Sequence, residues 1–98
     1  MQNNIIMDNL TVQHEKDNHR FTMAINGEIA KVAYQLRDGK MYLTYSEVPY
    51  NLRGKGYGKE LVERTFEQLT KEGYKAVAVC SYIKAVARRS EKWNAIIQ

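Results

Sequence analysis

The stretch Val48-Pro49-Tyr50-Asn51-Leu52-Arg53-Gly54-Lys55-Gly56-Tyr57-Gly58 passes from an apolar run through a basic, glycine-rich turn into a helical pattern. Glycines at alternating positions let the backbone turn tightly and approach a ligand, because no Cβ stands in the way. The free N–H groups and the dipole of a helix's first turn favour an anion there. Arg53, Lys55 and Lys59 add cationic side chains. The stretch therefore predicts a cradle for a phosphate or a pyrophosphate.

The residues before this turn predict an antiparallel meander. Apolar and polar residues alternate in several short runs, as in half-buried strands, and two dipeptides suit two-residue hairpin turns. The expected strands are Leu10–Glu15, Arg20–Ile25, Glu28–Arg37 and Met41–Val48, with tight turns at Asn26-Gly27 and Asp38-Gly39. Ala30 and Lys31 interrupt the alternation of the third strand, which is compatible with a β-bulge.

The residues after the turn predict a change to helix. Apolar residues recur every four positions from about Gly56 to Glu72, and Gly73 is a plausible stop. The nearly continuous apolar run from Lys75 to Cys80 indicates a strand covered on both faces and joined to the fourth strand by a right-handed crossover. From Ser81 on, the pattern indicates one helix or two. The fold class is therefore α+β.

Length and composition limit the functional classes. The 98 residues fit a single domain, 1–98, with residues 1–8 expected to be frayed. The net charge of +4 comes from scattered basic residues, which argues against a nucleic-acid-binding arm. The single cysteine, Cys80, excludes an internal disulfide and indicates a reducing, cytoplasmic location. The sequence shows neither a targeting signal nor a membrane-spanning run, so we expect no membrane partner.

Two standard nucleotide-binding motifs do not fit the glycine turn. A P-loop requires Gly-Lys followed by Ser or Thr, and neither Lys55 nor Lys59 is followed by either residue. A dinucleotide fingerprint requires repeated βαβ units, whereas this pattern contains one such unit after a meander. The glycine turn is therefore neither a P-loop nor a dinucleotide-binding fingerprint.

The pattern Arg53-x-x-Gly56-x-Gly58, preceded by Val48-Pro49, resembles the coenzyme A pyrophosphate loop of the GNAT superfamily, the acyl-CoA-dependent N-acyltransferases. The resemblance implies a minimal GNAT-like fold in which the pantetheine arm of acetyl-CoA lies between the fourth and fifth strands. It implies that the pyrophosphate lies on N–H groups from about Lys55 to Lys59. The implied cofactor-binding residues are Val48, Arg53, Gly54, Lys55, Gly56, Tyr57, Gly58 and Lys59.

The sequence Cys80-Ser81-Tyr82 resembles a small GNAT subgroup of about this length, which carries Cys-Ser-Tyr/Phe after the same strand. A thiol before a helix N-terminus can act as a nucleophile that accepts an acyl group, or it can line the thioester site. The alternative is a buried cysteine of the core with a purely structural role. The subgroup often has a tyrosine where this chain has Val86, so Tyr82 is the substitute candidate for the general acid.

Glu47 is a second candidate catalytic residue, as the general base that deprotonates an amine directly or through a water. The alternative interpretation of Glu47 is an exposed, non-catalytic carboxylate at a strand end. The subgroup often has His-Thr before this glutamate, where this chain has Tyr45-Ser46. His14 and His19 share no ligand spacing with Cys80 and are expected on the surface, so no metal site is predicted.

The leading functional hypothesis is an acetyl-CoA-dependent N-acetyltransferase that acts on an amine of a small molecule or a protein lysine. A non-catalytic acyl-CoA-binding or sensing module is the alternative, and nucleic-acid binding through the basic turn is a weaker third one. The oligomeric state is expected to be a monomer or a weak homodimer, because an uncovered sheet edge can pair with a second copy.

Overall fold

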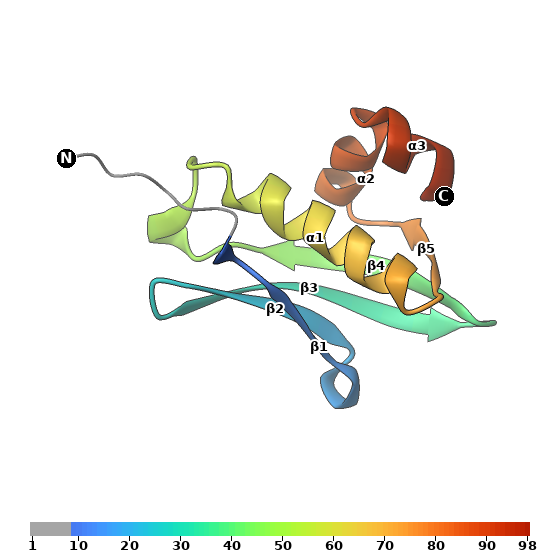
Figure 1. Ribbon diagram of the computed structural model, residues 1–98, viewed down its shortest axis with the longest axis horizontal. Coiled ribbons are helices and arrows are strands. Elements are labelled where there is room, and N and C mark those ends of the chain that lie inside the picture. The colour runs from blue at the N-terminus through green and yellow to red at the C-terminus, as the bar shows by residue number, and fades with distance from the viewer. Residues whose placement is uncertain (1–8) are drawn as a thin grey trace.

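The computed structural model of this chain describes residues 9–98, so the expected fraying of residues 1–8 lies outside the described residues. The sheet contains five strands in the order β1-β2-β3-β4-β5. Strands β1 to β4 pair with one another in antiparallel fashion, and β5 is parallel to β4 (Figure 1). The strands are β1 (Val12–Glu15), β2 (Arg20–Ile25), β3 (Glu28–Arg37), β4 (Lys40–Glu47) and β5 (Lys75–Ala78).

The three α-helices lie on one side of this sheet, with α1 over the strands and α2 and α3 near its β5 end (Figure 1). They are α1 (Tyr57–Lys71), α2 (Ser81–Arg88) and α3 (Glu91–Ile96). Short 3-10 turns occupy Lys16–Asn18 and Tyr50–Leu52. The predicted α+β class and the meander followed by a crossover helix and a parallel strand are confirmed, and the C-terminal pattern forms two helices.

Local turn chemistry explains the meander. Asn26 and Gly27 have φ angles of 51° and 81°, and Asp38 and Gly39 have φ angles of 52° and 79°. Both pairs therefore occupy the left-handed region that a two-residue hairpin turn requires. Gly73, at φ 89°, follows the end of α1 and allows the chain to reverse into β5.

The core lies between the helix-facing side of the sheet and α1. Three alternating residues of β2, Phe21, Met23 and Ile25, face the core and are at most 2% exposed. From α1, Leu61, Val62, Thr65, Phe66 and Leu69 are buried, as the four-residue spacing predicts. Phe66 also contacts Trp93 of α3, with ring centroids 5.4 Å apart, which joins the last helix to the same core.

The prediction that both faces of the fifth strand are covered is wrong. Ala76 and Ala78 are buried, but Val77 is only partly buried and Val79, just past the strand, is 51% exposed. The helices all lie on the side that Ala76 and Ala78 face, so the outward residues lack a covering layer. The edge of β5 that faces away from β4 pairs with the last residue, Gln98. The Gln98 N–H donates to the Ala76 carbonyl, and the Ala78 N–H donates to the Gln98 carbonyl.

The β-bulge lies in β4 rather than near Ala30 and Lys31. Tyr34 pairs with Leu43, whereas the preceding residue of β3, Ala33, pairs with Tyr45. Thr44 is therefore the extra residue in the ladder, and its hydroxyl donates to the Ala33 carbonyl at 3.4 Å. An extra residue reverses the alternation of every side chain that follows it in the strand.

His14 is not a surface residue, contrary to the prediction. Its side chain is 5% exposed and faces the core from β1. One ring nitrogen bonds the Glu72 carboxylate at 2.7 Å and the other bonds the Tyr34 hydroxyl at 2.5 Å. The ring stacks on Phe21 at 4.2 Å. We call His14, Tyr34 and Glu72 the closed cluster.

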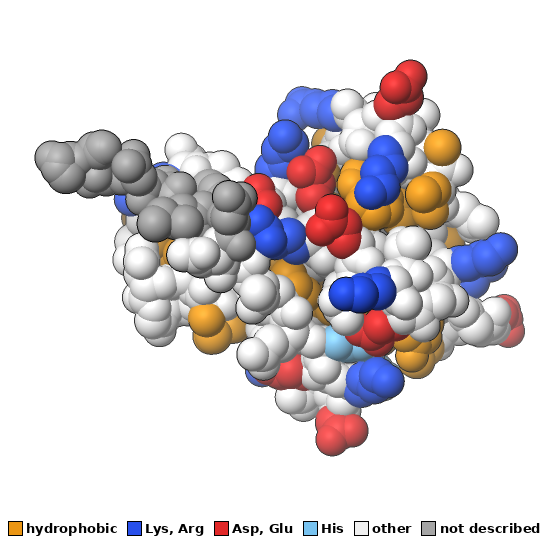
Figure 2. Space-filling view, in the orientation of Figure 1, with side chains coloured by type: hydrophobic (Ala, Val, Ile, Leu, Met, Phe, Trp, Pro, Cys, Tyr) orange, Lys and Arg blue, Asp and Glu red, His pale blue; other side chains and the backbone are white. Residues whose placement is uncertain are grey.

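The helical face of the molecule carries acidic and basic side chains that are interspersed (Figure 2). One ion pair there, Glu60 with Arg64 at 2.6 Å, joins consecutive turns of α1, as the sequence spacing suggests. Within residues 9–98, no helix is both long enough and apolar enough to cross a membrane.

Candidate functional site: a cavity between the glycine turn and Cys80

The glycine turn leads directly into α1. Gly54 and Gly56 have φ angles of 78° and 87°, which residues with a Cβ adopt only with strain. Gly56 is the N-cap of α1, and no side chain caps the helix there. The first-turn N–H groups are therefore left for water or for a ligand, and the helix dipole favours a negatively charged one.

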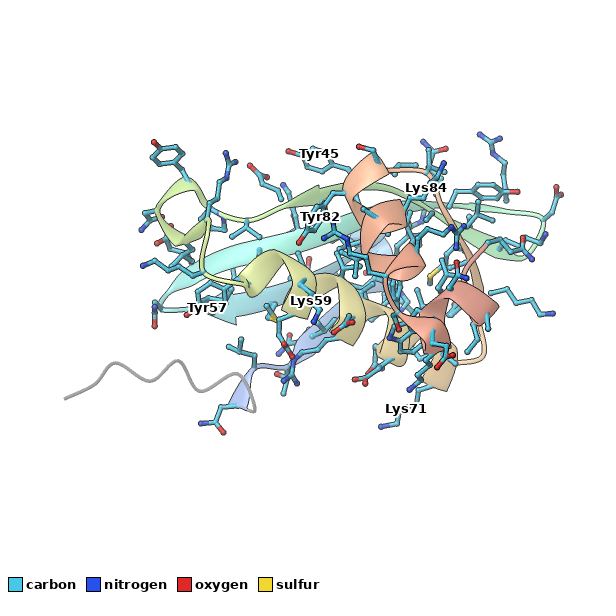
Figure 3. The ribbon with its side chains drawn as sticks, turned by 90° about the horizontal axis from the view of Figure 1, so that it is seen from above. Tyr45, Tyr57, Lys59, Lys71, Tyr82 and Lys84 are labelled. Atoms are coloured by element: carbon cyan, nitrogen blue, oxygen red, sulfur yellow. The ribbon has the colours of Figure 1, made fainter. Side chains whose placement is uncertain are left out.

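Gly58, in the first turn of α1, allows the helix to approach Tyr82 of α2. A Cβ at this position would lie 2.9 Å from the Tyr82 hydroxyl oxygen, which is too short for an ordinary contact. Viewed from above the helices, Tyr82 lies between the end of β4 and the start of α1 (Figure 3). Burial raises the pKa of Tyr82, Arg89 opposes that rise, and Glu63 adds to it.

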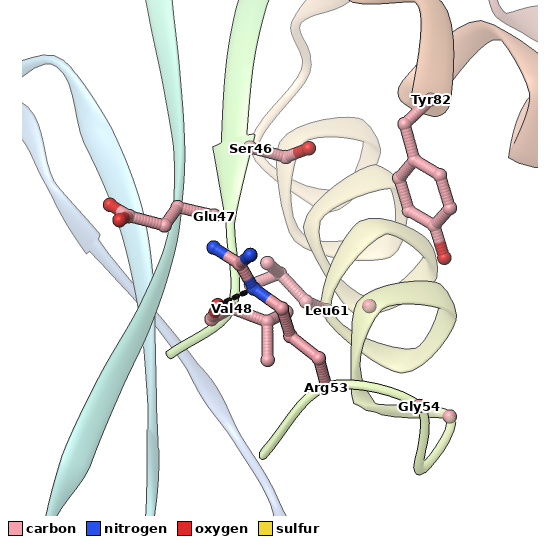
Figure 4. Close-up of a pocket in the computed structure, with 9 residues that line it drawn as sticks. Ser46, Glu47, Val48, Arg53, Gly54, Leu61 and Tyr82 are labelled. Atoms are coloured by element: carbon pink, nitrogen blue, oxygen red, sulfur yellow. Dashed lines mark hydrogen bonds between the residues drawn. The ribbon is translucent and has the colours of Figure 1, made fainter. Parts of the chain in front are cut away.

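A cavity of about 400 Å³ opens between the glycine turn, the end of β4 and Tyr82 (Figure 4). Its lining residues are Ser46, Glu47, Val48, Arg53, Gly54, Gly56, Gly58, Leu61 and Tyr82. A second cavity of about 500 Å³ shares Tyr82 and is also lined by Lys59, Glu63, Val86, Arg89 and Ser90. Tyr82 lines both cavities, so the two lie on either side of this side chain or adjoin at it.

Arg53 reaches back across the turn. Its Nε donates to the Val48 carbonyl at 2.9 Å, and its guanidinium lies over the Tyr50 ring, 5.7 Å from the centroid. The hydrogen bond connects the end of β4 to the glycine turn. It uses one of five guanidinium N–H donors, so the others can bind an anion in the cavity.

Cys80, just past β5, is the N-cap of α2 and is partly buried. Burial of the thiol raises its pKa, but hydrogen bonds from the backbone N–H groups of Ile83 and Tyr82 and from Ser46 outweigh burial. The net result is a thiol pKa below its usual value of 9.0. A helix N-terminus stabilises thiolate in this way, and thiolate is the nucleophilic form.

The bulge at Thr44 decides which face of the sheet Ser46 and Glu47 each occupy. Ser46 pairs with the inward residue Val32, and its hydroxyl lies 3.7 Å from the Cys80 sulfur on the helical side. Glu47 pairs with Lys31 and points the other way, as Figure 4 shows. Its carboxylate is 3.6 Å from the Lys31 ammonium and 40% exposed. Cys80 and Glu47 therefore lie on opposite faces of β4.

The remaining predicted cofactor-binding residues differ in whether they line a cavity, are exposed or are buried in the core. Val48 lines the cavity and packs against the core, and Lys59 lines the second cavity. Lys55 is exposed in the turn. The Tyr57 side chain is 5% exposed in the core, so only its backbone can face a ligand. Among residues 9–98, no group of three His, Cys, Asp or Glu side chains could hold a metal ion.

Ser46 is the site residue that sequence reasoning missed. The strict alternation of β4 would place Ser46 opposite to Leu43 and would place Tyr45 and Glu47 on the same side as Leu43. The bulge inverts this assignment. The available signal was the pair Tyr45-Ser46 directly before Glu47, at the position where the resembled subgroup has His-Thr.

Comparisons with known proteins agree with this geometry. A family model described as GCN5-related N-acetyl-transferase matches residues 20–96, which includes β2 to β5, the glycine turn and all three α-helices. The chain is also similar to "Protein NATD1" of Gallus gallus, Homo sapiens and Xenopus tropicalis, each 27% identical over 84 residues. The matches cover 83% of this chain and 76%, 74% and 77% of those relatives, respectively. The chain therefore belongs to the GCN5-related N-acetyltransferase family.

Proposed function

We propose that this protein binds acetyl-CoA and transfers its acetyl group to an amine, with Cys80 as the intermediate acceptor. The observation that carries the proposal is the cavity that runs from the glycine turn to Ser46, whose hydroxyl lies beside the Cys80 thiol. The cavity thus has the anion cradle at one end and, at the other, the serine that contacts the nucleophile. The matching family model supports the same activity.

The pyrophosphate of acetyl-CoA would lie on the uncapped N–H groups at the start of α1, near Arg53. The adjoining cavity fits the nucleotide end, because Lys59 and Arg89 line it and can pair with phosphate. The pantetheine arm would then run past Val48 and Leu61 toward Cys80. Acetyl-CoA is the co-substrate, and its thioester supplies the activated acetyl group.

The proposed reaction has two steps. The Cys80 thiolate attacks the thioester carbonyl carbon, the bond from that carbon to the CoA sulfur breaks, and CoA leaves as a thiolate that takes up a proton. The amine nitrogen then attacks the acetyl-Cys80 carbonyl carbon. The bond to Sγ breaks, and an amide forms with loss of the amine's proton. Tyr82 is the proposed proton donor to the departing CoA thiolate, because its hydroxyl lines the cavity.

Direct attack by the amine is the competing route, with Glu47 as the base. Glu47 contributes to the cavity lining, but its carboxylate points to the open face of the sheet and pairs with Lys31, so this route fits an acceptor that approaches from that face. The acceptor class in either route is a primary amine, of a small molecule or of a protein lysine.

Isothermal titration calorimetry with acetyl-CoA tests the binding step. We expect saturable binding, and we expect Arg53→Gln to weaken it about tenfold, as loss of a charge-assisted hydrogen bond does. Arg37→Gln is the matched control, because Arg37 is an exposed arginine of β3 outside both cavities. Absence of saturable binding to the unaltered protein would refute the proposal.

Mass spectrometry of the intact protein after brief exposure to acetyl-CoA tests the covalent step. We expect an added acetyl group on Cys80, and we expect an amine to remove it. A protein that binds acetyl-CoA, remains unmodified and acetylates no amine would instead be a binding or sensing module.

A further inference from the structure

The Cys80 thiol has two kinds of hydrogen-bonding neighbours, and they come from different parts of the fold. The backbone N–H groups of Tyr82 and Ile83 belong to the first turn of α2 and are present whatever the side chains are. Ser46 comes from β4, and its hydroxyl lies 3.7 Å from Sγ, a distance that suits a hydrogen bond to sulfur. The side-chain contribution to the thiol environment therefore depends on β4.

We infer that Ser46 is a positioning residue that holds the Cys80 sulfur in its reactive, ionised form. This inference rests on the proposed function, and it deepens it by assigning a role to a residue that the glycine-turn and cysteine motifs do not contain. Ser46 is partly buried and lines the cavity in which the thioester would lie. Its hydroxyl therefore touches both the nucleophile and the space of the proposed substrate.

A hydroxyl group suits this role because it can rotate. When Cys80 is a thiol, its S–H donates to the serine oxygen. When Cys80 is a thiolate, the serine O–H donates to the sulfur. A hydrogen bond to the charged form favours that form. The serine thus keeps the sulfur in one place through ionisation, and the proton of the thiol leaves to solvent.

The bulge at Thr44 is what brings this hydroxyl to the sulfur. Without the extra residue, Ser46 would face the open side of the sheet and a carboxylate at position 47 would face the helical side. A carboxylate beside Cys80 would oppose ionisation of the thiol, because two negative charges would lie close together. The bulge therefore removes the Glu47 charge from the thiol and substitutes a neutral donor.

The ionisable side chains that line the same cavity as Ser46 are fixed by contacts that do not involve Ser46. Tyr82 packs over Gly58, Arg53 bonds the Val48 carbonyl, and Glu47 pairs with Lys31 on the opposite face. A change that removes only the hydroxyl at position 46 therefore leaves these charges in place. The pH dependence of Cys80 reactivity can then be assigned to that hydroxyl.

The test is the rate of Cys80 alkylation by iodoacetamide as a function of pH, because Cys80 is the only cysteine. This measurement needs no acetyl transfer. For Ser46→Ala we expect the pH midpoint to rise by about one unit, so that the rate at pH 7 falls about tenfold. Thr70→Ala, which removes an exposed hydroxyl from the last turn of α1, should leave both values unchanged.

A second pair of variants separates the hydroxyl from packing. Ser46→Thr keeps the hydroxyl, whereas Ser46→Val has the shape of the threonine variant with a methyl group in place of the hydroxyl. The alkylation midpoint of the threonine variant should therefore resemble that of the unaltered protein. The midpoint of the valine variant should resemble that of Ser46→Ala. In acetyl transfer we expect kcat to fall about tenfold with Ser46→Val, while the KM for acetyl-CoA changes less than twofold.

An unchanged alkylation midpoint in Ser46→Ala, or equal midpoints for the threonine and valine variants, would overturn the inference even if the protein is an active acetyltransferase. Conversely, a shifted midpoint in a protein that transfers no acetyl group would support the role of Ser46 at the thiol and refute the proposed reaction. The two ideas can therefore fail separately.

Discussion

Two polar clusters lie on the helical side of this sheet, and they differ in how completely their hydrogen bonds are used. In the closed cluster, both His14 ring nitrogens have partners, and the Glu72 carboxylate also accepts from Gln68 at 2.7 Å. At the other site, Ser46 and Tyr82 line a cavity and Cys80 contacts Ser46, and we call these three residues the open cluster. A saturated buried network stabilises one structure, whereas donors beside a cavity remain available to a substrate.

The comparison predicts that changes in the closed cluster reduce stability without reducing ligand binding or acetyl transfer. At the open cluster and the cavity beside it, changes should reduce acetyl transfer or ligand binding with little loss of stability. Four changes test this separation, in order of expected effect.

The largest effect is expected from Cys80→Ala. Loss of the nucleophile should reduce acetyl transfer at least about 100-fold, because the covalent route then has no acceptor. Acetyl-CoA affinity and the urea midpoint should change little, since Cys80 is only partly buried. Steady-state assays and calorimetry measure the two quantities. Unchanged turnover would exclude the covalent route and leave Glu47 as the candidate base.

His14→Leu should give the largest loss of stability. The change leaves the Tyr34 hydroxyl buried without its partner, and a buried unsatisfied group of this kind costs about 2–3 kcal/mol of unfolding free energy. Urea denaturation gives the value. His19→Asn is the matched control, because it removes a ring that stacks on Tyr34, with centroids 5.5 Å apart, but leaves the hydrogen bonds of His14 in place. His19 is exposed at φ 52°, a conformation that asparagine tolerates. A loss below about 0.5 kcal/mol would show that the cluster does not carry stability.

Gly58→Ala should weaken acetyl-CoA binding about tenfold with little loss of stability. The new Cβ meets the Tyr82 hydroxyl at 2.9 Å and narrows the cavity, whereas the Tyr82 side chain can move and alanine favours the helix by up to about 1 kcal/mol. Calorimetry and urea denaturation report the two effects. Unaltered affinity would argue that the ligand does not approach the first turn of α1.

The smallest effect is expected from Glu72→Gln, through the pH dependence of stability. Burial of this carboxyl raises its pKa, but hydrogen bonds from Gln68 and His14 outweigh burial, so its pKa lies below the usual 4.5. A lowered folded-state pKa contributes stability that is present above pH 4.5 and is lost as pH falls through the folded-state value. On acidification, the unfolding free energy of the variant should therefore fall by about 0.5–1 kcal/mol less than that of the unaltered protein.

Urea midpoints measured between pH 6 and pH 3 check this expectation. Glu67→Gln serves as the control, since Glu67 is an exposed glutamate of the same helix. Identical pH profiles for Glu72→Gln and the unaltered protein would mean that the hydrogen bonds to the Glu72 carboxylate do not contribute to the free energy of unfolding.

Much of the fold could be predicted because its determinants are local. Asn26-Gly27 and Asp38-Gly39 form the tight turns that their left-handed conformations favour. The four-residue spacing in α1 buries the expected face. The glycine turn lies at the start of α1, with Gly56 at its N-cap. In each of these cases, neighbouring residues in the chain decide the conformation.

The sequence by itself also determined which groups are available for chemistry: one thiol before a helix, one basic glycine turn and one carboxylate at a strand end. Only the tertiary structure decided which of them meet. The Thr44 bulge turned Ser46 toward Cys80 and Glu47 away from it, and packing buried His14 between β3 and α1. Alternation along a strand is a local property, but strand pairing decides where that alternation is interrupted.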